Sequence, residues 1–275
     1  MINASRFLRA ANSLVQLSTP RSGVVLLTLA NPPRNAISIP MGDAFVKAID
    51  DVKQMGSAVR CVVVTGSPPA FCAGGDLQFL NDRMSFPEDE NVREMMTFYK
   101  RFTRIRDLYV PSIAAINGAA FGAGLCLTLS CDIRLASAEA KLSFNFTQLG
   151  LHPGMAATHL LPTLIGPQRA AHLLLTSAVV SGTEAAAMGL VLKAVSAPED
   201  VVTAALDMAG QIAENSPQAV RCTVETLRSH AGSTLETGLL REASCQSTNY
   251  KYKKDLTEGL AAVKEKRKPS FSNLS

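Results

Sequence analysis

Residues 117–132 read NGAAFGAGLCLTLSCD, a glycine-rich turn followed by an apolar run. The segment comes directly after the short apolar stretch Ile113–Ile116 and ends at its first charged residue, Asp132. This order is typical of a buried strand, a tight turn and a buried helix. Backbone N–H groups in the first turn of a helix have no partner within it, so they can bind a developing anion. The sequence therefore predicts a strand-to-helix turn that presents main-chain donors.

A second glycine-rich segment, AFCAGGDL (Ala70–Leu77), follows another predicted strand, Cys61–Thr65, and a Pro-Pro turn. Two adjacent glycines let the backbone approach a ligand closely. If the two loops meet, they form an oxyanion hole from main chain alone. Both segments are equally consistent with plain strand-to-helix turns that bind nothing, and the residues themselves leave these two interpretations open.

The rest of the chain alternates strands and helices before it becomes helical. Val24–Leu29 and Ile133–Ala136 are further β-branched or apolar runs, and Pro40–Met55 has apolar residues at helical spacing. This alternation predicts an α/β fold with a parallel sheet. After Ser181 the pattern is helical, in the segments Thr183–Met188, Pro198–Asn215, Pro217–His230 and Leu235–Lys268.

Composition limits the class of protein. With 275 residues the chain can bury a large core without disulfides or a metal. Its six cysteines lack metal-ligand spacing, so we expect no metal site and a reducing compartment. The net charge of +4 is mild, which does not indicate nucleic acid as the main partner, and no apolar run is long enough for a membrane span.

The N-terminal residues differ from the rest in charge. Arg6, Arg9 and Arg21 occur there with several Ser and Ala, and no acidic residue precedes Asp43. This composition is typical of a mitochondrial transit peptide, although a short leader of another kind has the same composition and would leave the protein cytoplasmic. We therefore expect a leader at 1–21, a core at 22–210 and a helical oligomerisation region at 211–275.

Several segments together carry a family resemblance. The chain resembles the crotonase, or enoyl-CoA hydratase/isomerase, superfamily over about residues 22–271, in the expected order of motifs: NPPRNAIS, VVVTGSPPAFCAGGDL, PSIAAINGAAFGAGLCLTLSCDIRLAS, LGLHPG and EKRKPSF. The resemblance implies a crotonase-type β-β-α superhelix, in which two stacked sheets are flanked by helices. It also implies a C-terminal helical region that assembles a homotrimer or a hexamer of two trimers. The substrate would be a coenzyme A thioester, with no further cofactor.

The resemblance also implies positions for substrate binding. The backbone N–H groups of Gly75 and Ala123 would hold the thioester oxygen, and the backbone around Ala73 would hold the adenine end of coenzyme A. Lys266 would approach a phosphate, from the same or a neighbouring subunit. Phe146 and Met155 would line the acyl channel. Asp76 lies in the same binding loop, where we expect its carboxylate to brace the backbone.

The residues at the expected positions of the catalytic acid and base differ from those that the resemblance implies. Hydratases of this superfamily use two glutamates, and the resemblance puts Cys126 and Phe146 at those positions, while an isomerase-type acid position falls on Gly154. The remaining candidates for proton transfer are the Cys126 thiol and His152, whose ordinary pKa suits a proton shuttle. Each also has an ordinary structural interpretation, Cys126 as a small apolar filler and His152 as a loop histidine bonded to backbone.

Three functions remain open on this basis. The first is an enzyme of the hydratase/isomerase type that stabilises a thioester enolate in fatty or branched acyl-CoA metabolism. The second is a catalytically silent acyl-CoA-binding or assembly protein that has lost both glutamates. The third, an RNA-binding member of the superfamily, would use the basic segment 251–268, which has seven basic and three acidic residues.

Overall fold

The computed structural model describes residues 13–229, 235–251 and 253–271. Its main sheet has six strands in the order β1-β2-β3-β5-β7-β9, and only the β1–β2 pair is antiparallel. The strands are β1 (Val15–Arg21), β2 (Val24–Leu29), β3 (Cys61–Gly66), β5 (Ser112–Ile116), β7 (Ile133–Ser137) and β9 (Lys193–Val195).

A second, smaller sheet supports the glycine-rich loops. It contains three short parallel strands, β4 (Ala70–Cys72), β6 (Ala119–Phe121) and β8 (Leu142–Ser143), in the order β4-β6-β8. Each glycine-rich segment leaves one of its strands, so the sheet brings the two loops to the same edge. This arrangement matches the predicted pair of sheets.

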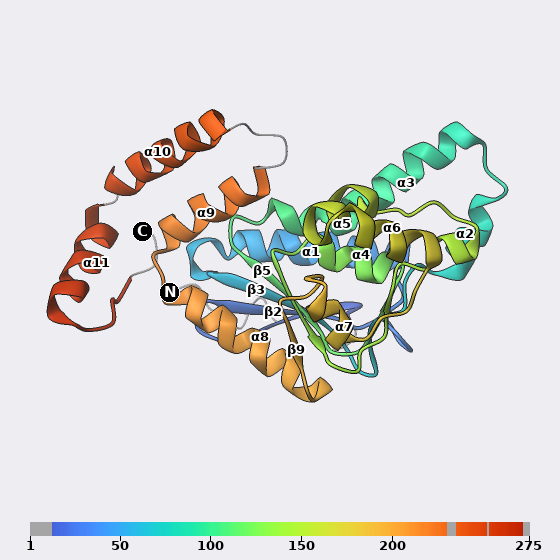
Figure 1. Ribbon diagram of the computed structural model, residues 1–275, viewed down its shortest axis with the longest axis horizontal. Coiled ribbons are helices and arrows are strands. Elements are labelled where there is room, and N and C mark those ends of the chain that lie inside the picture. The colour runs from blue at the N-terminus through green and yellow to red at the C-terminus, as the bar shows by residue number, and fades with distance from the viewer. Residues whose placement is uncertain (1–12, 230–234, 252, 272–275) are drawn as a thin grey trace.

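Helices cover both faces of the main sheet (Figure 1). Alternate side chains of β3 separate the two cores: Val62 and Val64 pack in the larger core, whereas Cys61 and Val63 pack against the other face together with Val201 of α8. The helices of the core are α1 (Ile39–Gln54), α2 (Leu77–Arg83), α3 (Glu88–Thr103), α4 (Ala123–Leu129), α5 (Ala157–Ile165), α6 (Pro167–Thr176), α7 (Gly182–Ala187) and α8 (Pro198–Ala213).

The chain ends in a helical region. Figure 1 shows α9 (Pro217–Ser229), α10 (Leu235–Lys251) and α11 (Lys253–Glu265) at one end of the molecule, with α2 and α3 at the opposite end. Within the described residues, the predicted helical segment 235–268 contains α10 and α11. Within the described residues, no helix is long and apolar enough to cross a membrane.

Two domain boundaries lie elsewhere than the sequence suggests. Val15–Arg21 pairs with β2 in the main sheet and Val15 is fully buried, so the core includes residues that the sequence interpretation gave to the leader at 1–21. Residues 1–12 lie outside the described part of the chain. At the other boundary, α8 packs on the sheet as far as Ala213, beyond the expected limit at residue 210.

Candidate functional site

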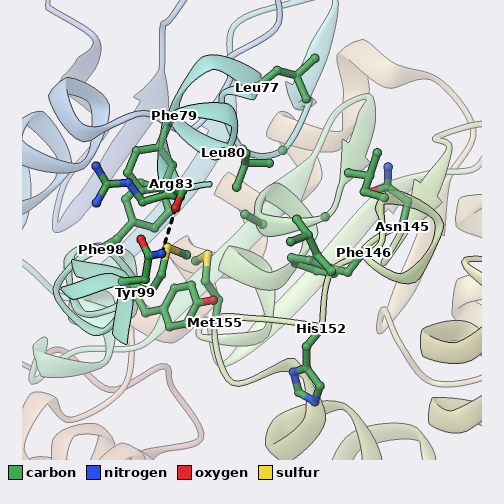
Figure 2. A pocket seen from close by; sticks show the side chains of 18 of the residues that line it. Leu77, Phe79, Leu80, Arg83, Phe98, Tyr99, Asn145, Phe146, His152 and Met155 are labelled. Carbon is green, nitrogen blue, oxygen red and sulfur yellow. Dashed lines mark hydrogen bonds between the residues drawn. The ribbon is translucent and has the colours of Figure 1, made fainter. Parts of the chain in front are cut away.

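The principal pocket is an apolar cavity of about 500 Å³ between the glycine-rich loops and the helices α2 and α3. This volume is typical of a site for a small organic ligand. Its lining is Ala73, Gly74, Gly75, Leu77, Phe79, Leu80, Arg83, Met84, Asn91, Met95, Phe98, Tyr99, Gly122, Ala123, Asn145, Phe146, Leu149, Leu151, His152 and Met155. The sequence-predicted residues Ala73, Gly75, Ala123, Phe146, His152 and Met155 thus come together around one cavity (Figure 2).

The two glycine-rich loops are in direct contact at this cavity. A Cβ atom on Gly74 would lie 2.9 Å from the carbonyl oxygen of Phe121, and one on Gly124 would lie 2.5 Å from the sulfur of Cys72. Both distances are too short for a side chain, so glycine is required for the backbones to approach. Gly74 also has φ of +100°, a conformation that favours glycine.

Both predicted oxyanion donors are available. Ala123 is the first residue of α4, where the N–H has no partner within the helix. Gly75 is flanked by bonds that leave its own N–H unused: Ile37 N donates to Gly74 O at 2.7 Å and Asp76 N donates to Ile37 O at 2.8 Å. Within the described residues, neither the Gly75 nor the Ala123 N–H donates a backbone hydrogen bond.

The segment Asn31–Ser38 holds the first loop in place. The buried Asn35 side chain donates to the carbonyl oxygens of Ala70 at 2.8 Å and Phe71 at 3.2 Å. Asp76 caps α2, because its Oδ1 accepts from Phe79 N at 2.9 Å. Asp76 is not among the residues that line the cavity, so the structure gives its carboxylate the bracing position that we expected.

Five polar side chains reach the cavity, and none is a carboxylate. They are Arg83, Asn91, Tyr99, Asn145 and His152, and no Asp or Glu of the described residues lines the cavity. No group of three or more His, Cys, Asp or Glu that could hold a metal occurs in the described part of the chain. Among the described residues, the polar groups at this cavity are therefore a guanidinium, two amides, a phenol and an imidazole.

His152 lies at the margin of the cavity. Its Nδ1 is 2.8 Å from the carbonyl oxygen of Pro153, which fits the tautomer in which Nδ1 donates and Nε2 keeps its lone pair. Figure 2 shows the ring at the edge of the labelled group, opposite Leu77. The imidazole is exposed, and within the described residues its Nε2 makes no hydrogen bond.

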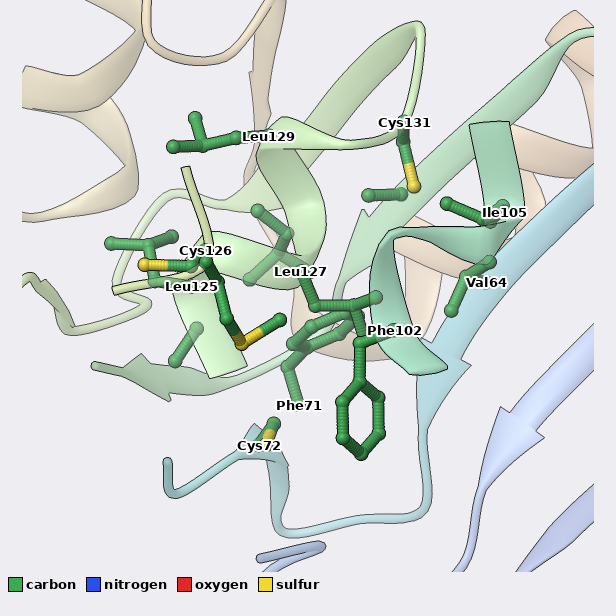
Figure 3. Close-up of a cluster of buried hydrophobic side chains, with 14 of the residues drawn as sticks. Val64, Phe71, Cys72, Phe102, Ile105, Leu125, Cys126, Leu127, Leu129 and Cys131 are labelled. Carbon is green, nitrogen blue, oxygen red and sulfur yellow. The ribbon is translucent and has the colours of Figure 1, made fainter. Parts of the chain in front are cut away.

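Cys126 lies inside the core and not in the cavity. The residue is fully buried and does not line the pocket, and Figure 3 shows its side chain within the hydrophobic cluster that also holds Cys72 and Leu125. Burial raises the pKa of the Cys126 thiol far above its usual range, so the thiolate is not formed near neutrality. The structure therefore supports the packing interpretation and gives the thiol no contact with a ligand.

Tyr99 is a cavity residue that sequence reasoning missed. It belongs to α3. Met95, Phe98, Tyr99 and Phe102 recur at helical spacing, and all of them lie in or against the core. This stripe was the signal that the helix faces the site.

Lys266 lies outside this cavity. It follows α11 in the C-terminal region, whereas the cavity lies beside α2 and α3 at the other end of the chain's structure (Figure 1). Lys266 therefore does not complete the site of its own chain.

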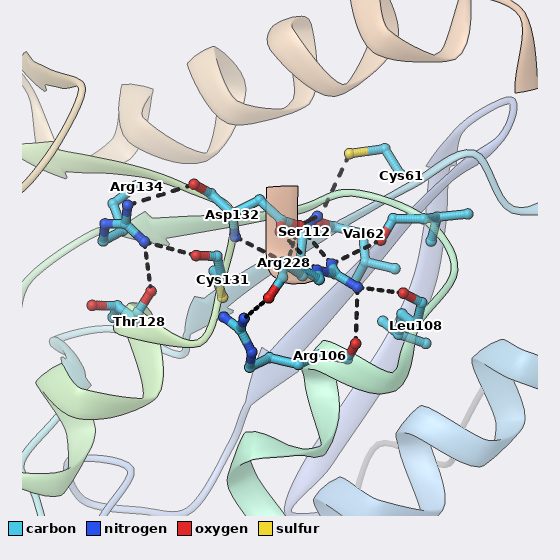
Figure 4. Close-up of polar contacts among 11 residues, drawn as sticks. Cys61, Val62, Arg106, Leu108, Ser112, Thr128, Cys131, Asp132, Arg134 and Arg228 are labelled. Atoms are coloured by element: carbon cyan, nitrogen blue, oxygen red, sulfur yellow. Dashed lines mark hydrogen bonds and ion pairs between the residues drawn. The ribbon is translucent and has the colours of Figure 1, made fainter. Parts of the chain in front are cut away.

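Asp132 takes part in structural contacts. Its Oδ2 accepts from Ser112 N at 2.7 Å and from Arg228 Nη2 at 2.6 Å, and Arg228 in turn donates to the carbonyl oxygens of Arg106, Leu108 and Val110 (Figure 4). The carboxylate faces the end of α9 and not the cavity. It therefore fixes the C-terminal helices to the core.

The comparisons with known proteins agree with this geometry. The family model for enoyl-CoA hydratase/isomerase matches residues 19–273. The chain belongs to this family. A mouse relative, mitochondrial methylglutaconyl-CoA hydratase, is 34% identical across 93% of this chain and 81% of its own length. The enoyl-CoA hydratase AFT3-1 of Alternaria alternata is 33% identical across 91% of this chain and 83% of its own length.

The crotonase fold is confirmed by solved structures. The enoyl-CoA hydratase of Bacillus anthracis superposes with a TM-score of 0.86 at 32% identity, covering 94% of this chain and 98% of that protein. The mixed α/β core and the C-terminal helical region therefore have the architecture that the resemblance implied. The chain is a family member, and the described residues that line its cavity include no Asp or Glu.

Proposed function

We propose that this protein is an acyl-CoA-binding enzyme of the hydratase/isomerase type, which stabilises a thioester enolate through the N–H groups of Gly75 and Ala123. The observation that carries the proposal is the contact between two glycine-rich loops whose main-chain donors are unused at an apolar cavity. Preorganised donors of this kind stabilise a developing oxyanion more than they stabilise the neutral carbonyl. The apolar lining suits a fatty or branched acyl chain.

The remaining parts of the site have separate roles in this proposal. Phe146 and Met155 contact the acyl group, Ala73 holds the adenine end of coenzyme A, and Asp76 keeps the binding loop in shape through α2. His152 accepts the proton that an attacking water loses, through its free Nε2. The Cys126 thiol takes no part.

Assembly and location belong to the proposal as well. Several large apolar side chains of the C-terminal helices are exposed in the single chain, among them Leu240 at 72% and Val263 at 78%. A homotrimer or hexamer would cover them and could bring Lys266 to the coenzyme A phosphates of a neighbouring subunit. A mitochondrial location is supported by the arginine-rich, acid-free start of the sequence and by the mitochondrial mouse relative.

The sharpest test removes one main-chain donor and compares it with a substitution that keeps the donor. Proline is well tolerated at the first position of a helix, so Ala123→Pro deletes the N–H at the start of α4 with little effect on the helix. Turnover of trans-2-enoyl-CoA or trans-3-enoyl-CoA, followed by mass and retention time, should fall by about 100- to 1000-fold. Ala123→Gly keeps the N–H and is the matched control, with turnover near that of the unmodified protein.

A second candidate is a catalytically silent acyl-CoA-binding protein. The absence of Asp and Glu from the described lining favours it, because hydration and isomerisation both need a proton acceptor. Calorimetric binding of saturated and unsaturated thioesters, run beside the turnover assay, separates the two. Tight binding with no conversion by the unmodified protein would establish the silent binder and refute the enzyme.

A further inference from the structure

The Tyr99 hydroxyl is a polar group without a partner in an apolar wall. Tyr99 is half-buried, lines the cavity, and its hydroxyl makes no hydrogen bond within the described residues. Among the described residues, the Tyr99 oxygen is not one of the buried polar atoms that lack a partner, so it is open to the cavity. A ligand bound in this cavity can therefore accept its hydrogen bond or its proton.

Contacts with neighbouring residues fix the position of the hydroxyl. A Cβ atom on Gly154 would lie 2.5 Å from Tyr99 Oη and 2.8 Å from the adjacent ring carbon, so the phenol occupies the space where a side chain at position 154 would begin. The Tyr99 ring also packs edge-on against Phe98, with centroids 6.4 Å apart. In Figure 2 the hydroxyl end of Tyr99 points toward the side of the cavity that carries Phe146.

The chemistry of the group suits donation and not acceptance of a proton. Burial raises the pKa of the Tyr99 phenol, with a smaller contribution from the nearby Cys126 thiol, so the proton remains on the oxygen at neutral pH. Of the other four polar side chains that line the cavity, His152 is exposed at the margin and the arginine and the two amides are poor acids near neutrality. Tyr99 is thus the best-enclosed proton donor among the described lining residues.

We propose that Tyr99 is the catalytic acid that delivers a proton to the α-carbon of the thioester enolate, an inference that rests on the proposed function. In the hydration direction, water forms a bond to the β-carbon and gives its extra proton to His152 Nε2. The enolate electron pair then forms a bond to the Tyr99 proton, the Oη–H bond breaks, and the thioester carbonyl is restored. Solvent returns a proton to the phenolate and removes one from the imidazolium, so protons balance over the cycle.

The first experiment compares Tyr99→Phe with Tyr109→Phe. Phenylalanine keeps the ring packing and removes only the hydroxyl, and Tyr109 is a control because it is 62% exposed and does not line this cavity. For Tyr99→Phe we expect kcat for enoyl-CoA conversion to fall by about 100-fold or more, with KM and the calorimetric affinity for a saturated acyl-CoA changed less than about threefold. Tyr109→Phe should match the unmodified protein.

A second measurement detects proton donation directly. Replacement of Tyr99 with 3-fluorotyrosine makes the phenol more acidic while keeping its shape, so the alkaline limb of the kcat–pH profile should move to lower pH. A residue that only packs would not move that limb. An unmoved limb, or a Tyr99→Phe variant whose kcat stays within about threefold of the unmodified protein, overturns the assignment.

The remaining outcomes separate this inference from the proposed function. If Tyr99→Phe loses acyl-CoA affinity and kcat to the same extent, the residue shapes the pocket and is not the acid, while the function stands. If the unmodified protein binds acyl-CoA but converts no enoyl-CoA and exchanges no α-hydrogen for deuterium, both proposals fail together.

Discussion

Arg228 and Asp132 form a two-point ion pair, with Nε to Oδ1 at 2.8 Å and Nη2 to Oδ2 at 2.6 Å. The two side chains are 11% and 19% exposed, so the pair is largely shielded from water. The pair joins the last turn of α9 to Asp132, which lies between α4 and β7. The C-terminal helices are therefore attached to the same part of the core that presents Ala123.

Breaking this pair should destabilise the fold. Asp132→Asn removes the negative charge and leaves the guanidinium of Arg228 unpaired in a poorly solvated place, which should lower the free energy of unfolding by about 3 kcal/mol. Urea unfolding followed by circular dichroism measures this change. Asp89→Asn is the control, because Asp89 and Arg93 form an ion pair on the surface, with side chains 72% and 70% exposed. This substitution should lower the free energy of unfolding by about 0.5 kcal/mol or less. Equal effects of both substitutions would contradict a stabilising role of the Arg228–Asp132 pair.

The start of α4 should tolerate no added atom. Gly124→Ala places a methyl group 2.5 Å from the sulfur and 2.7 Å from the carbonyl oxygen of Cys72, so β4 and α4 must separate. We expect a loss of about 1–3 kcal/mol in the free energy of unfolding, together with weaker binding of acyl-CoA. Gly238→Ala, in α10, is the matched control, since nothing lies within 4 Å of the new methyl group. If Gly124→Ala had the same free energy of unfolding as the unmodified protein, β4 and α4 would not be packed as closely as described.

Stability should fall in alkaline solution because of the buried thiols. Burial raises the pKa values of Cys61, Cys72 and Cys131 to about 12, from 9.0 in an unfolded chain. Between those values the unfolded state loses thiol protons that the folded state keeps, so the free energy of unfolding decreases as pH rises. Each thiol contributes about 1.4 kcal/mol per pH unit at most. Urea titrations from pH 8 to 10.5 measure the slope, which should become shallower in Cys61→Val.

His152 should affect turnover and leave affinity unchanged. If its Nε2 accepts the proton of the attacking water, His152→Ala should reduce kcat by about 100-fold or more and change coenzyme A affinity little. His172→Ala is a suitable control, because His172 is exposed on α6 and does not line the cavity. Unchanged kcat in His152→Ala would remove this residue from the mechanism.

The sequence predicted the parts of the fold that depend on local pattern. β-Branched runs such as Val24–Leu29 became strands with the predicted bounds, since a buried parallel strand needs only a short continuous apolar run. The strands β4 and β8 are three and two residues long, too short to leave a periodic signal.

A residue of the cavity was predictable only where it lies within a local sequence motif. The loops that contain Gly75 and Ala123 are visible in the sequence, and six of the predicted residues line one cavity. Tyr99 reaches the cavity because α3 packs against the LGLHPG loop, and the helical spacing of its apolar residues indicates a buried face without identifying the loop that this face meets. The burial of Cys126 likewise depends on how α4 packs, since helix position alone did not distinguish a core thiol from one that faces a ligand.

The helices on the two sides of the cavity, α4 on one and α2 and α3 on the other, differ in how many of their residues are buried. Every residue of α4 is buried, whereas α2 buries only Phe79 and α3 only Phe98 and Phe102. A library of variants randomised over α4 would consist mostly of unfolded chains, while one randomised over α2 and α3 would remain largely folded. New ligand specificities should therefore be obtained by directed evolution of α2 and α3, with α4 kept unchanged.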